Sequence, residues 1–172
     1  HGEVYNPDGV LYGRLPEFRL SERGHAMAEA AALELAGSDR IVRKLAASPL
    51  ERTQQSARPI AGALSLESAT DARIIGPTDA FVGLKNSGPD AAFKTPKHWL
   101  KFINPFRPSW GEPYRSIASR MRDAMNEAWD ATAGGDIVFV THQAPIWVTH
   151  LDVAGKALFH DPRSRRCELS SI

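Results

Sequence analysis

The segment from Asp136 to Thr141 constrains the fold of this chain more than any other. It contains the unbroken apolar run Ile137-Val138-Phe139-Val140, comes after two glycines, and leads directly into Thr141-His142. A continuous run of strand-forming apolar residues is typical of a parallel strand that is covered on both faces. We therefore expect residues 136–141 to form a central strand of an α/β fold.

Helical patterns alternate with short apolar segments along the rest of the chain. Ser21 is a good N-cap, Pro59 is expected to kink or split its helix, and Gly134-Gly135 should end the helix that begins at Pro113. The expected helices cover 22–35, 50–64, 113–133 and 144–153, and the other expected strands cover 41–47, 66–75 and 167–172. This alternation predicts a three-layer α/β/α sandwich with a mainly parallel central sheet.

The segment 76–111 differs in character from the rest and is called the lid segment below. It is rich in Pro, Gly and aromatic residues, and it shows no sustained helical or strand period. A stretch of this length without regular structure is more often a lid or binding loop than a spacer. Five of its side chains are Lys or Arg and one between 83 and 110 is acidic, which gives that part a net charge of +4.

The composition limits the classes of protein to which the chain can belong. Its 172 residues fit a single domain, 1–172, whose ends look trimmed because there is no initiator Met and the last residues stop in a strand-like pattern. Cys167 is the single cysteine, so an internal disulfide framework and a multi-thiolate metal site are excluded. The net charge of +1 gives no global attraction to nucleic acid or to a membrane. With no long apolar run or signal peptide in view, we expect a cytoplasmic protein.

Three residues with suitable chemistry fall where a parallel sheet binds its ligands. His1 opens the loop after the presumed first strand, Arg52 follows the strand at 41–47, and His142 follows the strand at 136–141. Ligands of open parallel sheets lie at the carboxyl ends of the strands. Two imidazoles and a guanidinium at this edge indicate a phosphate site.

The order of five short motifs resembles the histidine phosphatase superfamily, whose fold is shared by cofactor-dependent phosphoglycerate mutases and many small phosphatases. Each motif is weak alone, but their order and separation together are specific, and they extend over nearly the whole chain. The motifs are His1-Gly2-Glu3, Tyr12-Gly13-Arg14 with 20–24, residues 48–53, Gly111-Glu112, and Val140-Thr141-His142.

The resemblance implies a role for each matching residue. His1 would be the nucleophile that forms a phosphohistidine, and Arg52 and His142 would hold the transferring phosphoryl oxygens. Glu112 would donate a proton to the leaving alcohol, for which its pKa should be raised by burial and by nearby phosphate charge. The family's usual Arg directly before the first His is expected outside this chain.

Other expected substrate contacts follow from the same resemblance. Asn6 would contact phosphate, although it lies one residue closer to the nucleophile than in the commonest pattern, and Arg14 would lie on the same rim. Gln143 follows His142 where the family often has glycine. Val82 precedes Gly83 where relatives often carry Glu, so an acid at that position is not expected to act here.

We interpret the chain as a phosphatase for a small phosphorylated molecule, because a mutase needs a closed site with a second anion subsite and longer insertions. A phosphoglycerate mutase-type phosphotransferase and a non-catalytic phosphate-binding domain are the alternatives. No cofactor is expected. A metal site is the weakest interpretation, since His142 and His150 are the wrong distance apart and no cluster has ligand spacing. Nucleic-acid binding lacks a motif.

Overall fold

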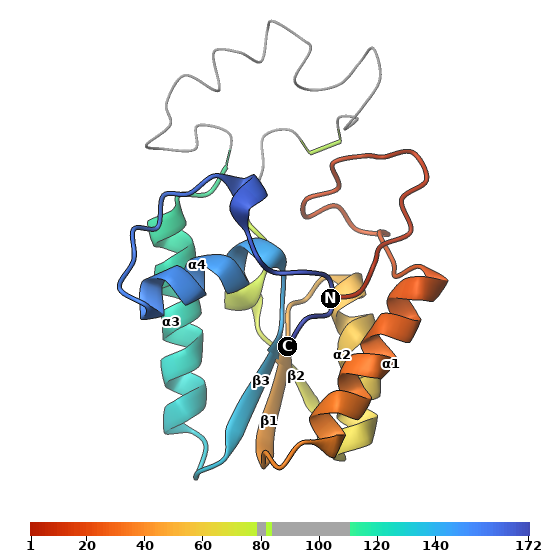
Figure 1. Ribbon diagram of the computed structural model, residues 1–172, viewed down its shortest axis with the longest axis vertical. Coiled ribbons are helices and arrows are strands. Elements are labelled where there is room, and N and C mark those ends of the chain that lie inside the picture. Colours follow the sequence, from red (N-terminus) through yellow and green to blue (C-terminus); the bar gives the residue numbers. More distant parts are fainter. Residues whose placement is uncertain (79–81, 84–110) are drawn as a thin grey trace, which may run out of the picture.

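Strands and helices alternate along the chain and place a parallel sheet between two layers of helices (Figure 1). The computed structural model describes residues 1–78, 82–83 and 111–172. The elements in chain order are α1 Glu22–Gly37, β1 Val42–Ala47, α2 Glu51–Leu64, β2 Ser68–Thr70, the 3-10 helix η1 Ala72–Ile74, α3 Tyr114–Asp130, β3 Asp136–Val140, α4 Gln143–Val153, and the 3-10 helix η4 Pro162–Ser164. The expected three-layer α/β/α class is confirmed.

Alternation along β1 gives the sheet two buried faces. Leu45 and Ala47 pack with Val140 against α1 and α2, whereas Ala46 packs on the opposite face against α3 and α4. Successive strand side chains point to opposite faces, so three consecutive small or apolar residues fill both cores. In Figure 1, α1 and α2 lie on one side of the strands and α3 and α4 on the other.

The predicted central position of the strand at 136–141 is wrong for the sheet that the described residues form. The strand order is β2-β1-β3, all parallel, so β1 is central and β3 lies at an edge. Four of the five β3 residues are only half-buried. The apolar run reflects helices packed on both faces of the strand, since Val138 and Phe139 contact opposite cores. Coverage of the faces and number of neighbouring strands are separate properties.

Capping explains the start of α1, whereas α2, α3 and α4 begin without a side-chain cap, and α3 ends at Asp130, before the expected stop at Gly134-Gly135. Ser21 caps α1 by accepting a hydrogen bond from the Gly24 N–H at 3.0 Å. Pro59 lies inside α2 without splitting it, and Pro113 comes one residue before the start of α3. The expected strand at 66–75 is shorter, Ser68–Thr70, and is followed by η1.

The predicted strand at 167–172 is wrong. A turn occupies this place, with Ser170 in the left-handed region at φ 54° and the Ser171 hydroxyl donating to the Glu168 carbonyl. This local hydrogen bond competes with strand pairing. The Ser170 N–H donates to the His1 carbonyl at 3.1 Å, so the turn lies beside the first residue of the chain.

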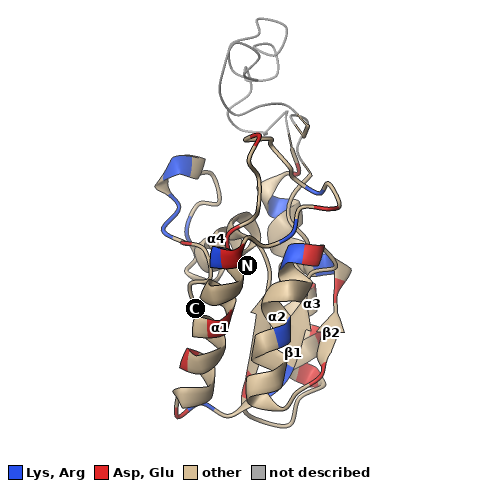
Figure 2. Ribbon diagram, turned by 90° about the vertical axis from the view of Figure 1, so that its right-hand side faces the viewer, with Lys and Arg blue, Asp and Glu red and all other residues tan. Residues whose placement is uncertain are grey.

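The described helices carry charged residues of both signs. Figure 2 shows basic and acidic residues interspersed along the helices. Within the described ranges, no helix combines the length and the apolar character needed to cross a membrane. The lid segment, apart from its two ends and Val82-Gly83, lies outside the described residues.

Candidate active site

The carboxyl ends of β1 and β3 meet where the sequence placed Arg52 and His142. β1 ends at Ala47 before Ser48-Pro49, and the Ser48 N–H donates to the Val140 carbonyl at 3.0 Å. The Ser48 hydroxyl is also hydrogen-bonded to Nε2 of His142 at 2.9 Å. Two loops that are 94 residues apart in sequence are thereby fixed to each other.

His1 lies against His142. The two imidazole rings meet edge to face, with centroids 5.1 Å apart and planes at 69°. The His1 Nδ1 atom lies 2.8 Å from the Gly2 carbonyl oxygen. A carbonyl only accepts hydrogen bonds, so Nδ1 carries the hydrogen and the Nε2 lone pair of the neutral ring is free to attack.

The glycine after His1 is required by packing. A Cβ atom built on Gly2 would lie 2.2 Å from the Gly24 carbonyl oxygen, and one built on Gly24 would lie 2.0 Å from the Glu3 carbonyl oxygen. The Gly2 N–H donates to the Ser56 hydroxyl in α2 at 3.1 Å. The first loop, which begins with residues 1–3, is therefore packed tightly between α1 and α2. This packing fixes the backbone that carries His1.

Arg52 extends from the first turn of α2 into this cluster and is 2% exposed. One guanidinium nitrogen donates to the Gly13 carbonyl at 2.6 Å, and the group lies over the Tyr12 ring, 4.8 Å from its centroid. Its Nε is buried without a hydrogen-bond partner, and no carboxylate of the described residues forms an ion pair with it. A buried cation in this state is suited to receive an anion.

His142 is neutral at physiological pH. Burial is the main cause that lowers its pKa to about 2, and the positive charges of Arg52, Arg120 and Arg14 lower it further. The ring is 6% exposed. It can therefore offer one N–H donor to a phosphoryl oxygen without a charge of its own.

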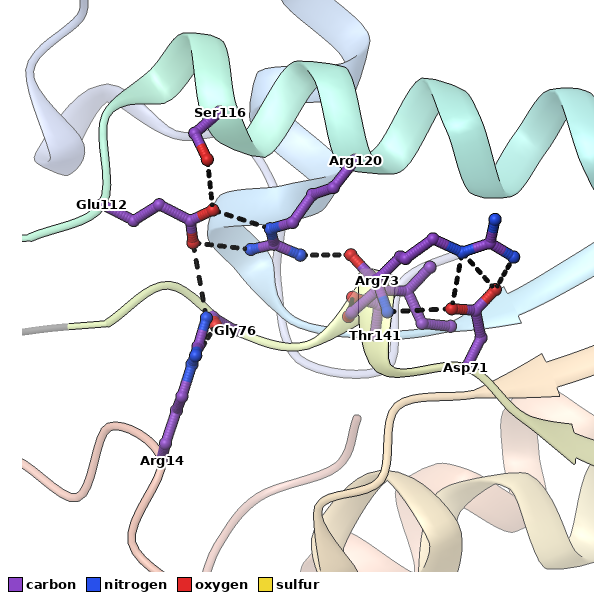
Figure 3. A network of polar contacts seen from close by, with 9 residues as sticks. Arg14, Asp71, Arg73, Gly76, Glu112, Ser116, Arg120 and Thr141 are labelled. Atoms are coloured by element: carbon purple, nitrogen blue, oxygen red, sulfur yellow. Dashed lines mark hydrogen bonds and ion pairs between the residues drawn. The ribbon is translucent and has the colours of Figure 1, made fainter.

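Glu112 is held by a network of polar side chains shown in Figure 3. Its Oε1 accepts from the Arg120 Nε at 2.8 Å and from the Ser116 hydroxyl at 2.9 Å, and its Oε2 accepts from a terminal nitrogen of Arg120 at 3.0 Å. Burial acts to raise the pKa of Glu112, but the Arg120 and Ser116 hydrogen bonds and the charges of Arg120 and Arg14 outweigh it and lower the pKa. The expected rise is thus not found in the protein without phosphate.

Arg14 connects Glu112 with the histidine cluster. It donates from Nε to the Gly76 carbonyl at 2.7 Å, and a terminal nitrogen lies 3.4 Å from Oε2 of Glu112. Gly76 in turn faces His142, since a Cβ atom on it would lie 3.4 Å from Cγ of that ring. Arg14 keeps 35% of its side chain exposed, so it remains accessible at the rim.

The two other predicted substrate contacts are engaged with backbone. The Asn6 amide donates to and accepts from Val10 at 2.8 and 3.0 Å, which closes the loop between them. The exposed Gln143 donates to the Cys167 carbonyl at 3.0 Å. Gln143 also lines a cavity of about 550 Å³ that borders His1 and Tyr12, whereas the contacts described for Asn6 do not reach His1, Arg52 or His142.

Two residues of the site were missed in the sequence, Ser48 and Arg120. Ser48 belongs to the 48–53 motif, but the sequence assigns it no role of its own. Ser116 and Arg120 lie four and eight residues after Glu112, a spacing that places them along one side of the α3 helix and was a usable signal. In the described part of the chain, no three His, Cys, Asp or Glu side chains gather in a metal-binding cluster.

A family model described as the histidine phosphatase superfamily (branch 1) matches residues 1–172. The chain belongs to this superfamily. The resemblance drawn from the five motifs is thereby confirmed. Membership of the histidine phosphatase superfamily supports a phosphatase or mutase-like activity acting on a small phosphorylated molecule.

The chain is also similar to other proteins in sequence and in fold. The chain is 47% identical over 172 residues to "Uncharacterized protein Rv0525" of Mycobacterium tuberculosis (strain ATCC 25618 / H37Rv), covering all of this chain and 84% of that protein. Its fold matches mycobacterial glucosyl-3-phosphoglycerate phosphatase Rv2419c with a TM-score of 0.72 at 23% identity, over 92% of this chain and 78% of the other.

A second solved structure, a putative alpha-ribazole-5'-P phosphatase from Escherichia coli str. K-12 substr. MG1655, matches with a TM-score of 0.73 at 20% identity. It covers 92% of this chain and 78% of that one. At these identities, the two solved structures show that the histidine phosphatase fold is shared.

Proposed function

We propose that this chain is a phosphatase that hydrolyses a phosphomonoester through a phosphohistidine on His1, with Arg52 and His142 as phosphoryl ligands and Glu112 as the proton donor. The observation that carries the proposal is the buried Arg52 guanidinium, which has an unpaired Nε and no carboxylate partner among the described residues. It lies in the same cluster as two contacting imidazoles. A phosphoryl group supplies the charge and the acceptors that this cluster lacks.

In the first half-reaction, Nε2 of His1 attacks phosphorus and the bond from phosphorus to the ester oxygen breaks. Glu112 in its protonated form gives its proton to the leaving oxygen and becomes a carboxylate. The negative charge of bound phosphate raises the pKa of a neighbouring carboxyl group, which favours that form in the complex. Arg52 and the neutral His142 stabilise the charge on the equatorial oxygens.

In the second half-reaction, water attacks the phosphohistidine. The Glu112 carboxylate accepts a proton from that water, and the bond from phosphorus to Nε2 breaks to release phosphate and neutral His1. The hydrogen on Nδ1 stays bonded to the Gly2 carbonyl, so the ring is cationic while phosphorylated and leaves readily. Glu112 is already in the carboxylate form needed here, because it gave its proton to the leaving oxygen in the first half-reaction.

The substrate contacts are proposed on the same basis. Arg14 is partly exposed at the rim beside Glu112, and Gln143 lines the cavity that borders His1. Asn6 is retained as a phosphate contact from the family resemblance. The basic and aromatic composition of the lid segment suits an anionic phosphoester with a flat or apolar portion.

Replacing the nucleophile tests the proposal directly. We expect His1→Ala to lower kcat for p-nitrophenyl phosphate by at least about 10³-fold, because the covalent route is lost. His25→Ala, an exposed histidine on α1, is the matched control and should keep wild-type activity. Equal rates in His1→Ala and wild type would exclude His1 as the nucleophile.

A second assay separates hydrolysis from mutase action. The protein is mixed with 3-phosphoglycerate and a trace of 2,3-bisphosphoglycerate, and both free phosphate and 2-phosphoglycerate are measured. Phosphate release without rapid interconversion is expected. Rapid interconversion without phosphate release would replace the phosphatase by the mutase alternative, and inactivity toward every phosphoester would favour a phosphate-binding domain.

A further inference from the structure

The guanidinium group of Arg120 forms two hydrogen bonds with the carboxylate of Glu112. Its Nε and one terminal nitrogen each donate to a different carboxylate oxygen, at 2.8 and 3.0 Å. Its other terminal nitrogen donates to the Arg73 carbonyl. With side-chain exposures of 16% and 12%, the two charged groups are mostly shielded from water. A two-point contact of this kind fixes direction as well as distance.

This two-point contact leaves the Oε2 atom of Glu112 with fewer short hydrogen bonds than Oε1. Oε1 is occupied by two donors from α3, Arg120 and Ser116. Oε2 has one close donor from Arg120, and its second neighbour is Arg14 at the longer distance of 3.4 Å. Arg14 also holds Gly76, which faces His142. Oε2 therefore has one short hydrogen bond where Oε1 has two, and its second neighbour is the partly exposed Arg14 side chain.

We propose that Arg120 is the positioning residue for Glu112, holding Oε1 against α3 so that Oε2 is the oxygen that transfers the proton. The inference rests on the proposed function, in which Glu112 exchanges a proton with the leaving group and with water. Arg120 does not touch the substrate in this account. It acts through the direction and the charge state of one carboxyl group.

The charge around Glu112 gives the proposal a measurable consequence. Among the described residues, the charged groups in contact with it are Arg120 from α3 and Arg14 from the first loop, and the segment 76–78 contributes backbone contacts. Both arginines lower the pKa of the Glu112 carboxyl group. Loss of Arg120 therefore raises this pKa, and the activity limb that needs protonated Glu112 moves to higher pH.

The test compares Arg120→Met with Arg122→Met, a matched loss of charge on the same helix, where Arg122 pairs with Asp152. Two substrates of similar shape are used, phenyl phosphate and p-nitrophenyl phosphate. We expect Arg120→Met to lower kcat/KM for phenyl phosphate, which reports the steps up to phosphoryl transfer to His1, by about 10²-fold, within the usual range for general acid catalysis. The loss for p-nitrophenyl phosphate should be much smaller, because nitrophenolate leaves without a proton. Arg122→Met should match wild type with both.

The pH profile separates positioning from a structural role. In Arg120→Met, the limb on which kcat falls as pH rises should move to higher pH, and Arg120→Lys, which keeps the charge but loses the fork, should lie between. If Arg120→Met does not fold, the same two measurements are made on Arg120→Lys. Equal losses with both substrates and an unmoved limb would overturn the inference while His1→Ala remained inactive. Full activity of His1→Ala would instead overturn the proposed function.

Discussion

His1 and His142 carry the same side chain, but their surroundings give them different chemistry. The Gly2 carbonyl fixes the hydrogen of His1 on Nδ1 and leaves Nε2 for attack. His142 is deeply buried and pairs with the Ser48 hydroxyl. Burial and neighbouring cations keep it uncharged, which suits the role that we propose for it as a hydrogen-bond donor to phosphate.

The low pKa of His142 predicts a pH-dependent stability. The folded ring titrates at about 2, whereas the unfolded ring titrates near 6.5, so the unfolded state binds an extra proton between these values. Stability from this residue is therefore lost as pH falls below about 6.5, at about 1.4 kcal/mol per pH unit. Between pH 7 and pH 5, wild type should lose about 2 kcal/mol of unfolding free energy from this cause.

Urea unfolding at both pH values measures this contribution, with His142→Gln as the comparison. The variant lacks the titrating ring and should lose less stability on acidification than wild type. The exposed His25→Ala variant should show the wild-type dependence. The same loss in wild type and in His142→Gln would contradict a buried, neutral His142.

At the scale of elements, the close approach of the first loop to α1 holds His1, the proposed nucleophile, in place. Gly2 and Gly24 bring two backbones nearer than any side chain allows. The Ser21 hydroxyl donates to a Glu3 carboxylate oxygen at 2.8 Å, in addition to capping the helix. The start of α1 therefore supports the loop that carries His1.

A methyl group at Gly24 should disturb both stability and activity. Gly24→Ala places Cβ 2.0 Å from the Glu3 carbonyl oxygen, and we expect a loss of at least about 2 kcal/mol in unfolding free energy together with reduced phosphatase activity. Gly62→Ala in α2 is the matched control, because its Cβ meets open space. It should raise stability by up to about 1 kcal/mol. Thermal or chemical unfolding measures the stability of both variants. Equal effects of Gly24→Ala and Gly62→Ala would argue against the close packing of the first loop on α1.

At the scale of the whole molecule, the layers and most of the site could be predicted because they depend on local signals. Ser21 marks a helix start, Ser48-Pro49 marks a strand end, and the topology of a parallel sheet brings Arg52 and His142 to one edge. The edge position of β3 was not predictable from its own residues. An apolar run in a strand indicates that helices cover both of its faces. It does not indicate how many strands pair with it.

The wrong predictions for the pKa of Glu112 and for the strand at 167–172 have a similar origin. The pKa of Glu112 depends on Arg120 and Arg14, whose side chains reach it from a different turn of helix and a different loop. Ser170 adopts a left-handed conformation within a pattern that alternates like a strand. The spacing of eight residues could have indicated the Arg120 contact, whereas the Arg14 contact, 98 residues away in sequence, and the backbone angle of Ser170 do not appear in a periodicity.

The most direct test of the account is to trap the phosphorylated protein. The wild-type chain is mixed with p-nitrophenyl phosphate, quenched within milliseconds without acid, digested and examined by mass spectrometry. We predict one phosphoryl group on the peptide that contains His1, located on the His1 ring, lost on mild acid treatment and missing in His1→Ala. A phosphoryl group on another residue, or turnover with no phosphorylated protein at any time, would contradict the central claim that His1 carries the phosphoryl group.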